Sequence, residues 1–351
     1  MEKNKMTAKE FMNKLLAGLS IGIVIALIPN ALFGELLKAI VPHFPQAQSI
    51  LDITLLAMRL SPMVIGVCIA MQFNLTPIQT VSVGMASVVG SGIATIAEKG
   101  AFVFAGTGDV INVAITASVA VALVLVLGNK LKAYTILLVP SISVIVAGSI
   151  GIFTLPYVKQ ITAMVGNVVN NFTNLQPILM GMLIAVCFAL LIVSPLSTVA
   201  VATAITLAGS GSGAANLGVV AAGFGLAVSG WKVNSFGTSV AHFLGSPKMQ
   251  MANFVKKPIM MLPILCNAAV LGGIAGILNI QGTPMSAGFG ISGLIGPINA
   301  INLMGGYNAK NIIMITAVFV VIPVVLSIIF NYIFTKVLKL VSEEDYKLNF
   351  E

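Results

Sequence analysis

The sequence predicts an all-α polytopic membrane protein, and three observations support this fold class. Of its 351 residues, 58% are hydrophobic and only 8% are charged, whereas soluble domains carry about 25% charged residues. Only four acidic residues lie between Lys14 and Lys339, and no charged side chain lies between Lys159 and Lys232. Because a charge at the bilayer centre costs at least about 2.5–3.5 kcal/mol, such runs are typical of segments that lie in lipid.

Ten apolar segments are long enough, at about 20 residues each, to span a bilayer as helices. They cover residues 15–40, 50–72, 78–97, 108–128, 133–155, 176–194, 196–213, 215–231, 258–279 and 311–337. With the N-terminus in the cytoplasm, the segments on that side carry 13 lysines and those on the opposite side carry four. This bias predicts that both termini are cytoplasmic. The net charge of +8 is therefore a topology signal, and we expect a multi-pass protein of the bacterial cytoplasmic membrane that contacts lipid and no nucleic acid.

Residues 158–175 differ from the spans because apolar side chains recur there at helical spacing. The apolar face is formed by Val158, Ile161, Val165, Val168, Phe172 and Leu175, and the opposite face carries Gln160 and four asparagines. This pattern predicts an amphipathic helix at the outer membrane interface. We expect it to connect an N-terminal membrane half (residues 1–157, spans 1–5) to a C-terminal half (residues 176–351, spans 6–10).

Two stretches, residues 67–92 and 186–211, share the order of their landmarks: a cysteine, a proline, a Thr-Val pair and a Gly-Ser-Gly triplet. Residues 138–152 also resemble residues 261–277. These similarities predict two repeats of four spans each, which would run parallel because four is an even number. The alternative is that membrane helices rich in Gly, Ala, Ser and Val resemble one another by composition.

Two glycine-rich segments interrupt the apolar runs near the C-terminus. Residues 208–218 read as a polar, flexible interruption, and residues 284–300 combine glycines with two prolines and no charge. Open backbone in lipid leaves N–H and C=O groups unsatisfied, so it survives only where protein covers it or water reaches it. We therefore expect residues 284–300 to form a re-entrant loop beside a small hydrophilic solute; the alternative is an extracellular loop without a ligand. The candidate solute-binding residues are Ser210, Ser212, Asn216, Ser292, Asn299 and Asn302.

Three further polar residues stand out. Arg59 is the one permanent charge expected inside a span, which makes it a functional hypothesis by default, although a side chain that snorkels to the interface is the alternative. The predicted cytoplasmic segment, residues 230–257, contains the only tryptophan, Asn234 and His242. This segment is either a plain connector, a docking site for a cytosolic partner, or part of an inner gate. Arg59, Asn234 and His242 are therefore candidates for gating or partner contact.

The sequence holds no motif for independent chemistry. No CxxC or HExxH spacing occurs, and the three cysteines lie inside apolar runs. We therefore expect no catalytic residue, no cofactor, no disulfide and no metal site.

Four motifs carry a resemblance to a known family: VGMASVVGSGIAT, AGSGSGAANLG, SGWKVNSFGTSVAHFLGSPKMQMANF and GFGISGLIGPINAINLMGG. With its ten expected spans, the chain resembles the membrane IIC component (EIIC) of the bacterial phosphotransferase system, in particular the branch that includes the perfringolysin O regulator. The resemblance implies a homodimer that binds a small hydrophilic solute, such as a sugar, in its C-terminal half. It also implies a cytosolic IIB-type partner that phosphorylates the sugar. At most, the chain would be the membrane component of a phosphoenolpyruvate-dependent sugar phosphotransferase.

The sequence departs from the family at one place that bears on function. Sugar-transporting IIC proteins typically carry a glutamate in a GITEP-like motif, whereas GISGLIGPI has Ser292 and Gly293 at that place and no acid. Two hypotheses follow: a solute transporter of the IIC type, and a membrane-embedded solute sensor or regulator without net transport. A passive channel is disfavoured because the sequence shows no continuous polar stripe.

Overall fold

The fold is built almost entirely of helices, as the sequence predicts. The computed structural model describes residues 6–97, 100–127, 130–131, 134–284 and 286–348. The chain divides into two compact units, the first comprising Met1–Leu27 and Leu55–Gln160 and the second comprising Ile28–Thr54 and Ile161–Glu351.

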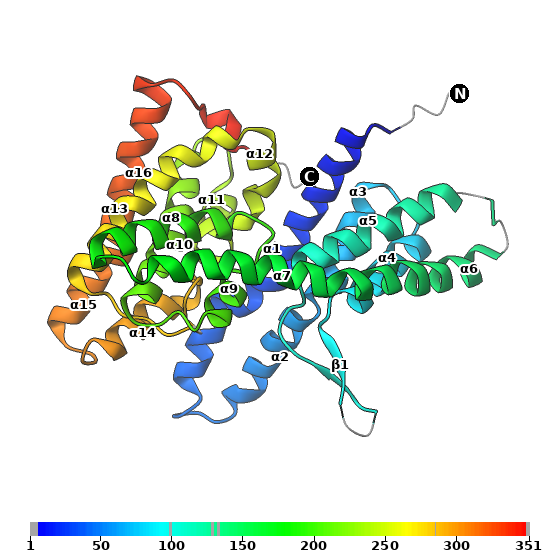
Figure 1. The fold of residues 1–351 in the computed structure, drawn as a ribbon, viewed down its shortest axis with the longest axis horizontal. Helices are drawn as coiled ribbons and strands as arrows, with labels where there is room; N and C mark the ends of the chain where they lie inside the picture. Colours follow the sequence, from blue (N-terminus) through cyan, green and yellow to red (C-terminus); the bar gives the residue numbers. More distant parts are fainter. Residues whose placement is uncertain (1–5, 98–99, 128–129, 132–133, 285, 349–351) are drawn as a thin grey trace. The chain divides into compact units, whose positions relative to one another are not determined.

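The first unit combines helices with one β-hairpin (Figure 1). Its elements, some of which continue into the second unit, are α1 (Ala8–Ile40), α2 (Ala47–Arg59), α3 (Ser61–Gln72), α4 (Pro77–Gly90), β1 (Ala94–Ile96), β2 (Phe102–Phe104), α5 (Val110–Leu127), α6 (Thr135–Ile142), the π-helical turn η2 (Ser143–Ala147) and α7 (Gly148–Phe172). Glycines bring α1 directly against α3, since a Cβ atom on Gly18 would lie 2.4 Å from the Cα atom of Ile69. Small residues permit this close helix packing in membranes.

The second unit is entirely helical apart from its loops. Its elements are α8 (Pro177–Ile192), α9 (Thr198–Ala204), α10 (Gly209–Ser229), α11 (Phe236–Leu244), η3 (Pro247–Gln250), α12 (Met251–Lys256), η4 (Pro258–Met261), α13 (Leu262–Leu278), η5 (Ser292–Leu294), α14 (Ile295–Leu303), α15 (Ala309–Thr316), η6 (Ala317–Val321), α16 (Ile322–Tyr332), η7 (Ile333–Val337) and η8 (Glu343–Tyr346). Helices α8, α10 and α13 pack against one another. Of the most apolar 18 residues of α10, 94% are buried, so α10 is the central helix of this unit.

The chain is an integral membrane protein by the length and composition of its helices. Six of the described helices are long and apolar enough to cross a bilayer. A seventh span is obtained if α2 and α3, which meet at a 48° bend, are counted as one. Two further apolar helices, α4 and α8, are shorter than the 18 residues required of a candidate span.

One predicted span near the centre of the chain is wrong, and its neighbour has other limits. In place of a span over residues 196–213 the structure has the seven-residue α9, whereas the predicted span 215–231 corresponds to the 21-residue α10, which begins earlier, at Gly209. The chain breaks at Thr206 and Gly209, which have positive φ angles of 50° and 62°. Residues 208–218 are therefore not a flexible interruption, because from Gly209 onward they form the first turns of α10.

Two other predicted elements have different limits in the structure. The predicted span 78–97 is helical only to Gly90, because Gly92 turns the chain with φ of 71° into the hairpin in which Ala94 pairs with Phe104. The predicted amphipathic helix is continuous with α7 and is not a separate element. Part of its expected apolar face is open, since Ile161 is 48% exposed.

Candidate functional site

The glycine-rich segment after α13, residues 280–294, lies along α10 and is called the glycine loop below. Gly209 and Gly282 exchange two backbone hydrogen bonds of 2.9 and 3.0 Å. One turn further along α10, the hydroxyl of Ser212 donates to the carbonyl of Thr283 at 2.8 Å. One more turn along, the backbone N–H of Gly290 donates to Asn216 Oδ1 at 3.0 Å. The loop thus follows α10 from its first residue toward its middle.

After its tip, the chain returns toward its starting level. Helix α14 follows the loop, and Asn299 Oδ1 on this helix accepts a hydrogen bond of 3.2 Å from the hydroxyl of Thr283. The segment therefore enters and leaves on the same side of the loop tip, which is the geometry of a re-entrant loop. Glycine is required in it, because Gly288 and Gly290 have φ angles of 89° and 63°, and a Cβ atom on Gly290 would lie 2.8 Å from the side chain of Val219.

Asn216 is the most unusual residue of this site. Its side chain is fully buried, and its Oδ1 atom is occupied by Gly290. Its Nδ2 atom has no hydrogen-bond partner among the described residues, and it is the only nitrogen among the five buried side-chain atoms in that condition. Buried N–H groups without a partner are rare because the cost of desolvation is not offset by a hydrogen bond within the protein. The amide of Asn216 therefore keeps one buried donor group without a partner among the described residues.

A second buried asparagine, Asn112 of α5, provides a contrast in the first unit. Its Nδ2 atom donates to the carbonyls of Gly90 and Gly151, and its Oδ1 atom accepts from the hydroxyl of Thr154 at 2.7 Å. This amide is bonded at both of its polar atoms. Asn112 therefore bonds helices to one another, whereas the Nδ2 group of Asn216 is an unsatisfied donor.

Three segments are hydrogen-bonded to one another in a ring that includes the glycine loop, and we call them the three-segment ring. The α8–α9 link (residues 193–197) leads into Thr198, whose hydroxyl donates to the carbonyl of Gly288 at 2.9 Å. The glycine loop contacts the α11–η3 turn (residues 244–248) through Ser292, whose hydroxyl donates to the carbonyls of Leu244 and Gly245 at 2.7 and 2.9 Å. Lys248 closes the ring, because its ammonium group donates to two carbonyls of the α8–α9 link.

Lys248 is buried without an acidic partner. Its side chain donates to the carbonyls of Ser194 and Leu196, the latter at 2.6 Å, and the residue is 6% exposed. Burial lowers the pKa of Lys248 to about 7, because desolvation penalises the charged form. In its charged form, this buried ammonium is a strong hydrogen-bond donor and a source of positive field.

The structure places the predicted solute-binding residues at different distances from this arrangement. Ser212 and Asn216 bond from α10 to the glycine loop. Ser292 bonds from the loop to the end of α11, and Asn299 on α14 bonds back to the loop at Thr283. Ser210 lies in the first turn of α10, half-buried, and Asn302 is exposed near the end of α14. Among the described residues, neither of these two side chains makes a hydrogen bond. Arg59 belongs to the first unit and is exposed at the end of α2, where the bend to α3 begins.

Asn234 and His242 belong to a separate polar cluster that binds the C-terminal segment. Asn234 Nδ2 donates to the carbonyl of Tyr346 at 2.9 Å, and Asn234 Oδ1 accepts from the backbone N–H of Leu348 at 2.8 Å. His242 is fully buried on α11, with Nδ1 3.2 Å from the carbonyl of Ser239 and Nε2 3.3 Å from Nε2 of Gln250. Since a carbonyl only accepts, Nδ1 carries the proton and Nε2 accepts from Gln250.

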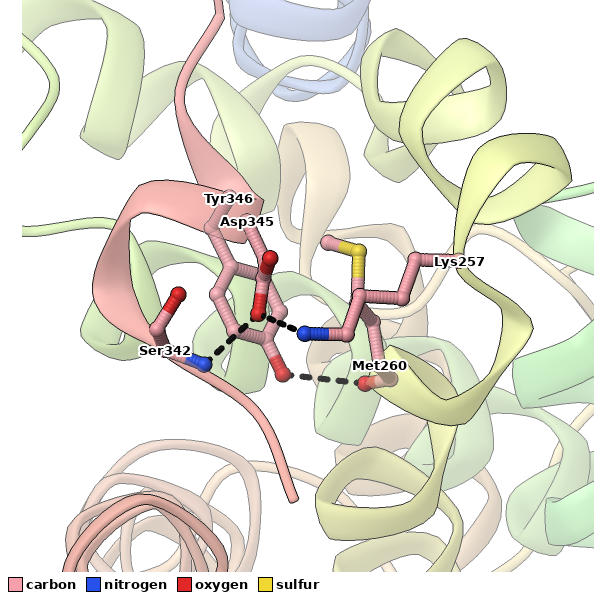
Figure 2. Close-up of polar contacts among 5 residues, drawn as sticks. All are labelled: Lys257, Met260, Ser342, Asp345 and Tyr346. Atoms are coloured by element: carbon pink, nitrogen blue, oxygen red, sulfur yellow. Dashed lines mark hydrogen bonds and ion pairs between the residues drawn. The ribbon is translucent and has the colours of Figure 1, made fainter. Parts of the chain in front are cut away.

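The C-terminal segment is fixed by further contacts that Figure 2 shows. The Tyr346 hydroxyl donates to the carbonyl of Met260 at 3.0 Å, and Lys257 forms an ion pair of 2.6 Å with Asp345. Burial raises the pKa of Asp345, but hydrogen bonds from Lys257 and Ser342 outweigh this effect and hold the pKa below its ordinary value. The predicted cytoplasmic segment is therefore covered in part by residues 343–348.

Sequence reasoning missed Thr198, Thr283, Lys248 and Gln250. Thr198 and Thr283 had no signal beyond their polarity. Their partners Gly288 and Ser212 lie 90 and 71 residues away in sequence, and only the fold brings them together. Lys248 had a signal, since it stands between apolar residues in SPKMQM, but it was counted only as a cytoplasmic charge.

No metal chemistry is suggested by the part of the chain that the structure describes. That part contains no group of three or more His, Cys, Asp or Glu side chains placed to hold an ion. The three cysteines are free thiols.

Comparison with known proteins identifies the family. A model of the phosphotransferase system EIIC family matches residues 13–348, which is nearly the whole chain. Neither the curated proteins nor the solved structures gave a match. The matched range contains the glycine loop, the buried amide of Asn216 and all candidate spans apart from the first five residues of α1. The chain is therefore a member of the EIIC family, the membrane component of the phosphotransferase system.

Proposed function

We propose that this chain is the solute-translocating component of a phosphotransferase-type system, with its solute bound where α10 meets the glycine loop. The observation that carries this proposal is Asn216, whose amide is held by Gly290 at one atom and has a free, fully buried N–H at the other. A re-entrant loop beside the central helix is a typical setting for a transporter site, because backbone there can leave helical geometry without facing lipid.

Family membership also suggests the partners. EIIC proteins in general act on sugars together with a IIB protein, and we extend this to a homodimer in the bacterial cytoplasmic membrane with both termini inside. The segment that a cytosolic partner would approach, residues 230–257, carries an exposed aromatic pair. Trp231 and Phe236 are 51% and 73% exposed, with ring centroids 5.8 Å apart.

A membrane-embedded solute sensor is the second candidate, and one observation favours it. The sequence contains no Asp or Glu from residue 110 to residue 342, so the glycine loop has no carboxylate to orient a sugar hydroxyl for phosphorylation. A sensor needs only a solute site and a surface that responds to it.

The test combines a binding screen with an uptake assay. Purified full-length protein is screened by thermal shift against sugars and sugar derivatives, and each hit is then offered to proteoliposomes with and without a phosphorylated IIB protein. Binding with uptake supports the transporter, and binding without uptake under both conditions supports the sensor.

The site itself is tested by Asn216→Asp, which keeps the acceptor for Gly290 and replaces the free amide by oxygen. We expect at least a tenfold loss of affinity for the hit. The matched control is Asn308→Asp, since Asn308 is exposed and caps α15 by accepting from the N–H of Asn311 at 2.9 Å, a role that aspartate performs equally well. Unchanged affinity in Asn216→Asp would place the solute elsewhere.

A further inference from the structure

The second unit has an unbalanced charge inventory around the proposed site. Acidic residues are absent from residue 110 to residue 342, and those that follow lie in the C-terminal segment. Glu343 and Asp345 there pair with Lys232 and Lys257, at 2.7 and 2.6 Å. Neither acid is available to Lys248.

Lys248 is the one buried lysine among the described residues. Its ammonium bonds only to neutral carbonyls, those of Ser194 and Leu196. Burying a charge without a counter-charge is costly, and proteins normally avoid it by pairing the group or by neutralising it. This position retains a buried lysine without an acidic partner among the described residues.

Lys248 and the free amide of Asn216 belong to the same hydrogen-bonded arrangement. Asn216 holds Gly290, which lies between Gly288 and Ser292 in the glycine loop. Gly288 accepts a hydrogen bond from Thr198, which follows the α8–α9 link that Lys248 contacts. Ser292 donates to the α11–η3 turn, which contains Lys248. The three-segment ring thus contains the ammonium group of Lys248 and no acidic side chain, and the amide of Asn216 on α10, which is bonded to the glycine loop of this ring, keeps an unused donor.

Building on the proposed function, we propose that the solute carries an anionic group, such as the carboxylate of a sugar acid, and that Lys248 supplies its counter-charge. The amide of Asn216 then donates to an oxygen of the same solute. A neutral sugar would leave the ammonium unpaired, whereas an acid of the same size would compensate it.

Binding of an anion would also be linked to protons. In the free protein, burial lowers the pKa of Lys248 to about 7, and an anion beside the ammonium favours the charged form and raises this pKa again. Binding above pH 7 therefore takes up a proton, and affinity should fall by up to about tenfold per pH unit as the pH rises above 7.

Few other groups near η3 could produce this dependence. Helices α10, α11 and α12 pack against η3, and Gln250 of η3 donates to the backbone carbonyl of Tyr346 in η8. Burial raises the pKa of Tyr346, and hydrogen bonds hold the pKa of Asp345 below its ordinary value, so neither of these groups of η8 changes its charge between pH 6 and pH 8. Helix α10 has no titratable side chain and α12 has only Lys256, which is exposed. On α11, burial lowers the pKa of His242 to about 4, so this imidazole stays neutral between pH 6 and pH 8. The α8–α9 link and the glycine loop contain no ionisable residue.

The experiment compares an acid with its neutral counterpart on the full-length protein, purified without anionic lipid. D-gluconate and D-glucitol form one pair, D-galacturonate and D-galactose a second, and inorganic phosphate tests for binding of a bare anion. We expect the acids to bind at least tenfold more tightly than their counterparts, and more tightly at pH 6.5 than at pH 8.5. Phosphate alone at equal affinity would overturn the sugar-acid assignment.

Variants isolate the contribution of Lys248. Lys248→Met should remove the preference for the acid and its pH dependence, Lys248→Arg should keep the preference and lose the pH dependence, and Lys310→Met serves as control because Lys310 is exposed. If Lys248→Met does not fold, the comparison of acid and neutral solute across pH in the unaltered protein still decides.

The failure of this inference is distinguishable from that of the proposed function. Binding of the neutral sugars as tightly as of the acids would overturn the inference and leave the proposed site in place. Absence of binding by acids and neutral sugars alike would overturn both.

Discussion

The hydroxyl of Tyr346 donates a hydrogen bond of 3.0 Å to the backbone carbonyl of Met260, 86 residues earlier in the chain. The ring of Tyr346 is fully buried, and the backbone carbonyl of the same residue accepts from both Asn234 and Gln250. The segment after the last span is therefore part of the folded second unit, and its removal would expose buried polar groups on three elements.

Two replacements of Tyr346 should separate the stability that its hydrogen bond contributes from the stability that the packing of its ring contributes. Tyr346→Phe loses one buried hydrogen bond and should cost about 1 kcal/mol of unfolding free energy. Tyr346→Ala also leaves a cavity and should cost about 3–5 kcal/mol. Thermal unfolding in detergent measures both, with Tyr332→Phe as control because Tyr332 is 61% exposed. Equal stability of the alanine variant and the unaltered protein would contradict a docked C-terminal segment.

Acidification should destabilise the protein through His242. Burial lowers the pKa of His242 to about 4 from its ordinary value of 6.5. Between pH 4 and pH 6.5, His242 is therefore protonated in the unfolded chain and neutral in the folded protein. The stability contribution of His242 is complete above pH 6.5 and declines as the pH falls toward 4, by about 3 kcal/mol at most. A protonated ring would also direct Nε2–H at the donor nitrogen of Gln250.

The check is unfolding between pH 4 and pH 7.5 for the protein and for His242→Gln. The variant has no group that titrates in this range at position 242, so its stability should depend less steeply on pH. Identical pH profiles would show that the histidine is accessible to protons in the folded state.

Glycine positions in α10 should tolerate no side chain. A Cβ atom at Gly213 would lie 1.9 Å from the carbonyl oxygen of Ile280, so Gly213→Ala must push the glycine loop away from α10. We expect a cost of about 1–3 kcal/mol, typical of overpacking, and weaker solute binding. Gly237→Ala is the matched control, because a Cβ atom there meets nothing within 4 Å and alanine is the better helix former. Thermal unfolding and solute affinity are measured for both variants, and a loss of both quantities is expected in Gly213→Ala only.

Ser292 should act on the site through its position. Its hydroxyl bonds to the carbonyls of Leu244 and Gly245, so Ser292→Ala frees the loop from the α11–η3 turn. A stability loss of about 1 kcal/mol is expected, with a lower solute affinity. Ser210→Ala should change neither quantity by much. A loss of affinity in Ser210→Ala alone, measured by thermal shift with solute, would reverse these roles.

Hydropathy predicted the long spans well because the lipid requirement acts on composition, as in α5 and α13. It failed where helix limits depend on packing. The start of α10 is rich in Gly and Ser, which are poor helix formers in water, yet these small residues let α10 approach other segments closely: a Cβ atom on Gly218 would lie 2.1 Å from the carbonyl oxygen of Ala185. Only the fold reveals that benefit.

The candidate site was predictable to the extent that polar residues among small apolar ones are conspicuous. Asn216 and Ser292 were found in this way. Lys248 was not, because its burial follows from the α8–α9 link folding over it, and no local pattern encodes that contact. Hydropathy also did not predict the 48° bend between α2 and α3, where Arg59 lies.

The satisfied amide of Asn112 has a consequence for the history of the chain. On the two-repeat prediction, α5 corresponds to α10: the Gly-Ser-Gly triplet precedes α5 at the end of α4 and forms the first turn of α10, and the β-hairpin is an insertion in the first copy. Asn112 and Asn216 would then descend from one ancestral residue whose two duplicates diverged. Under this prediction, the amide of one copy braces helices against each other, and the amide of the other copy keeps a buried donor without a partner among the described residues.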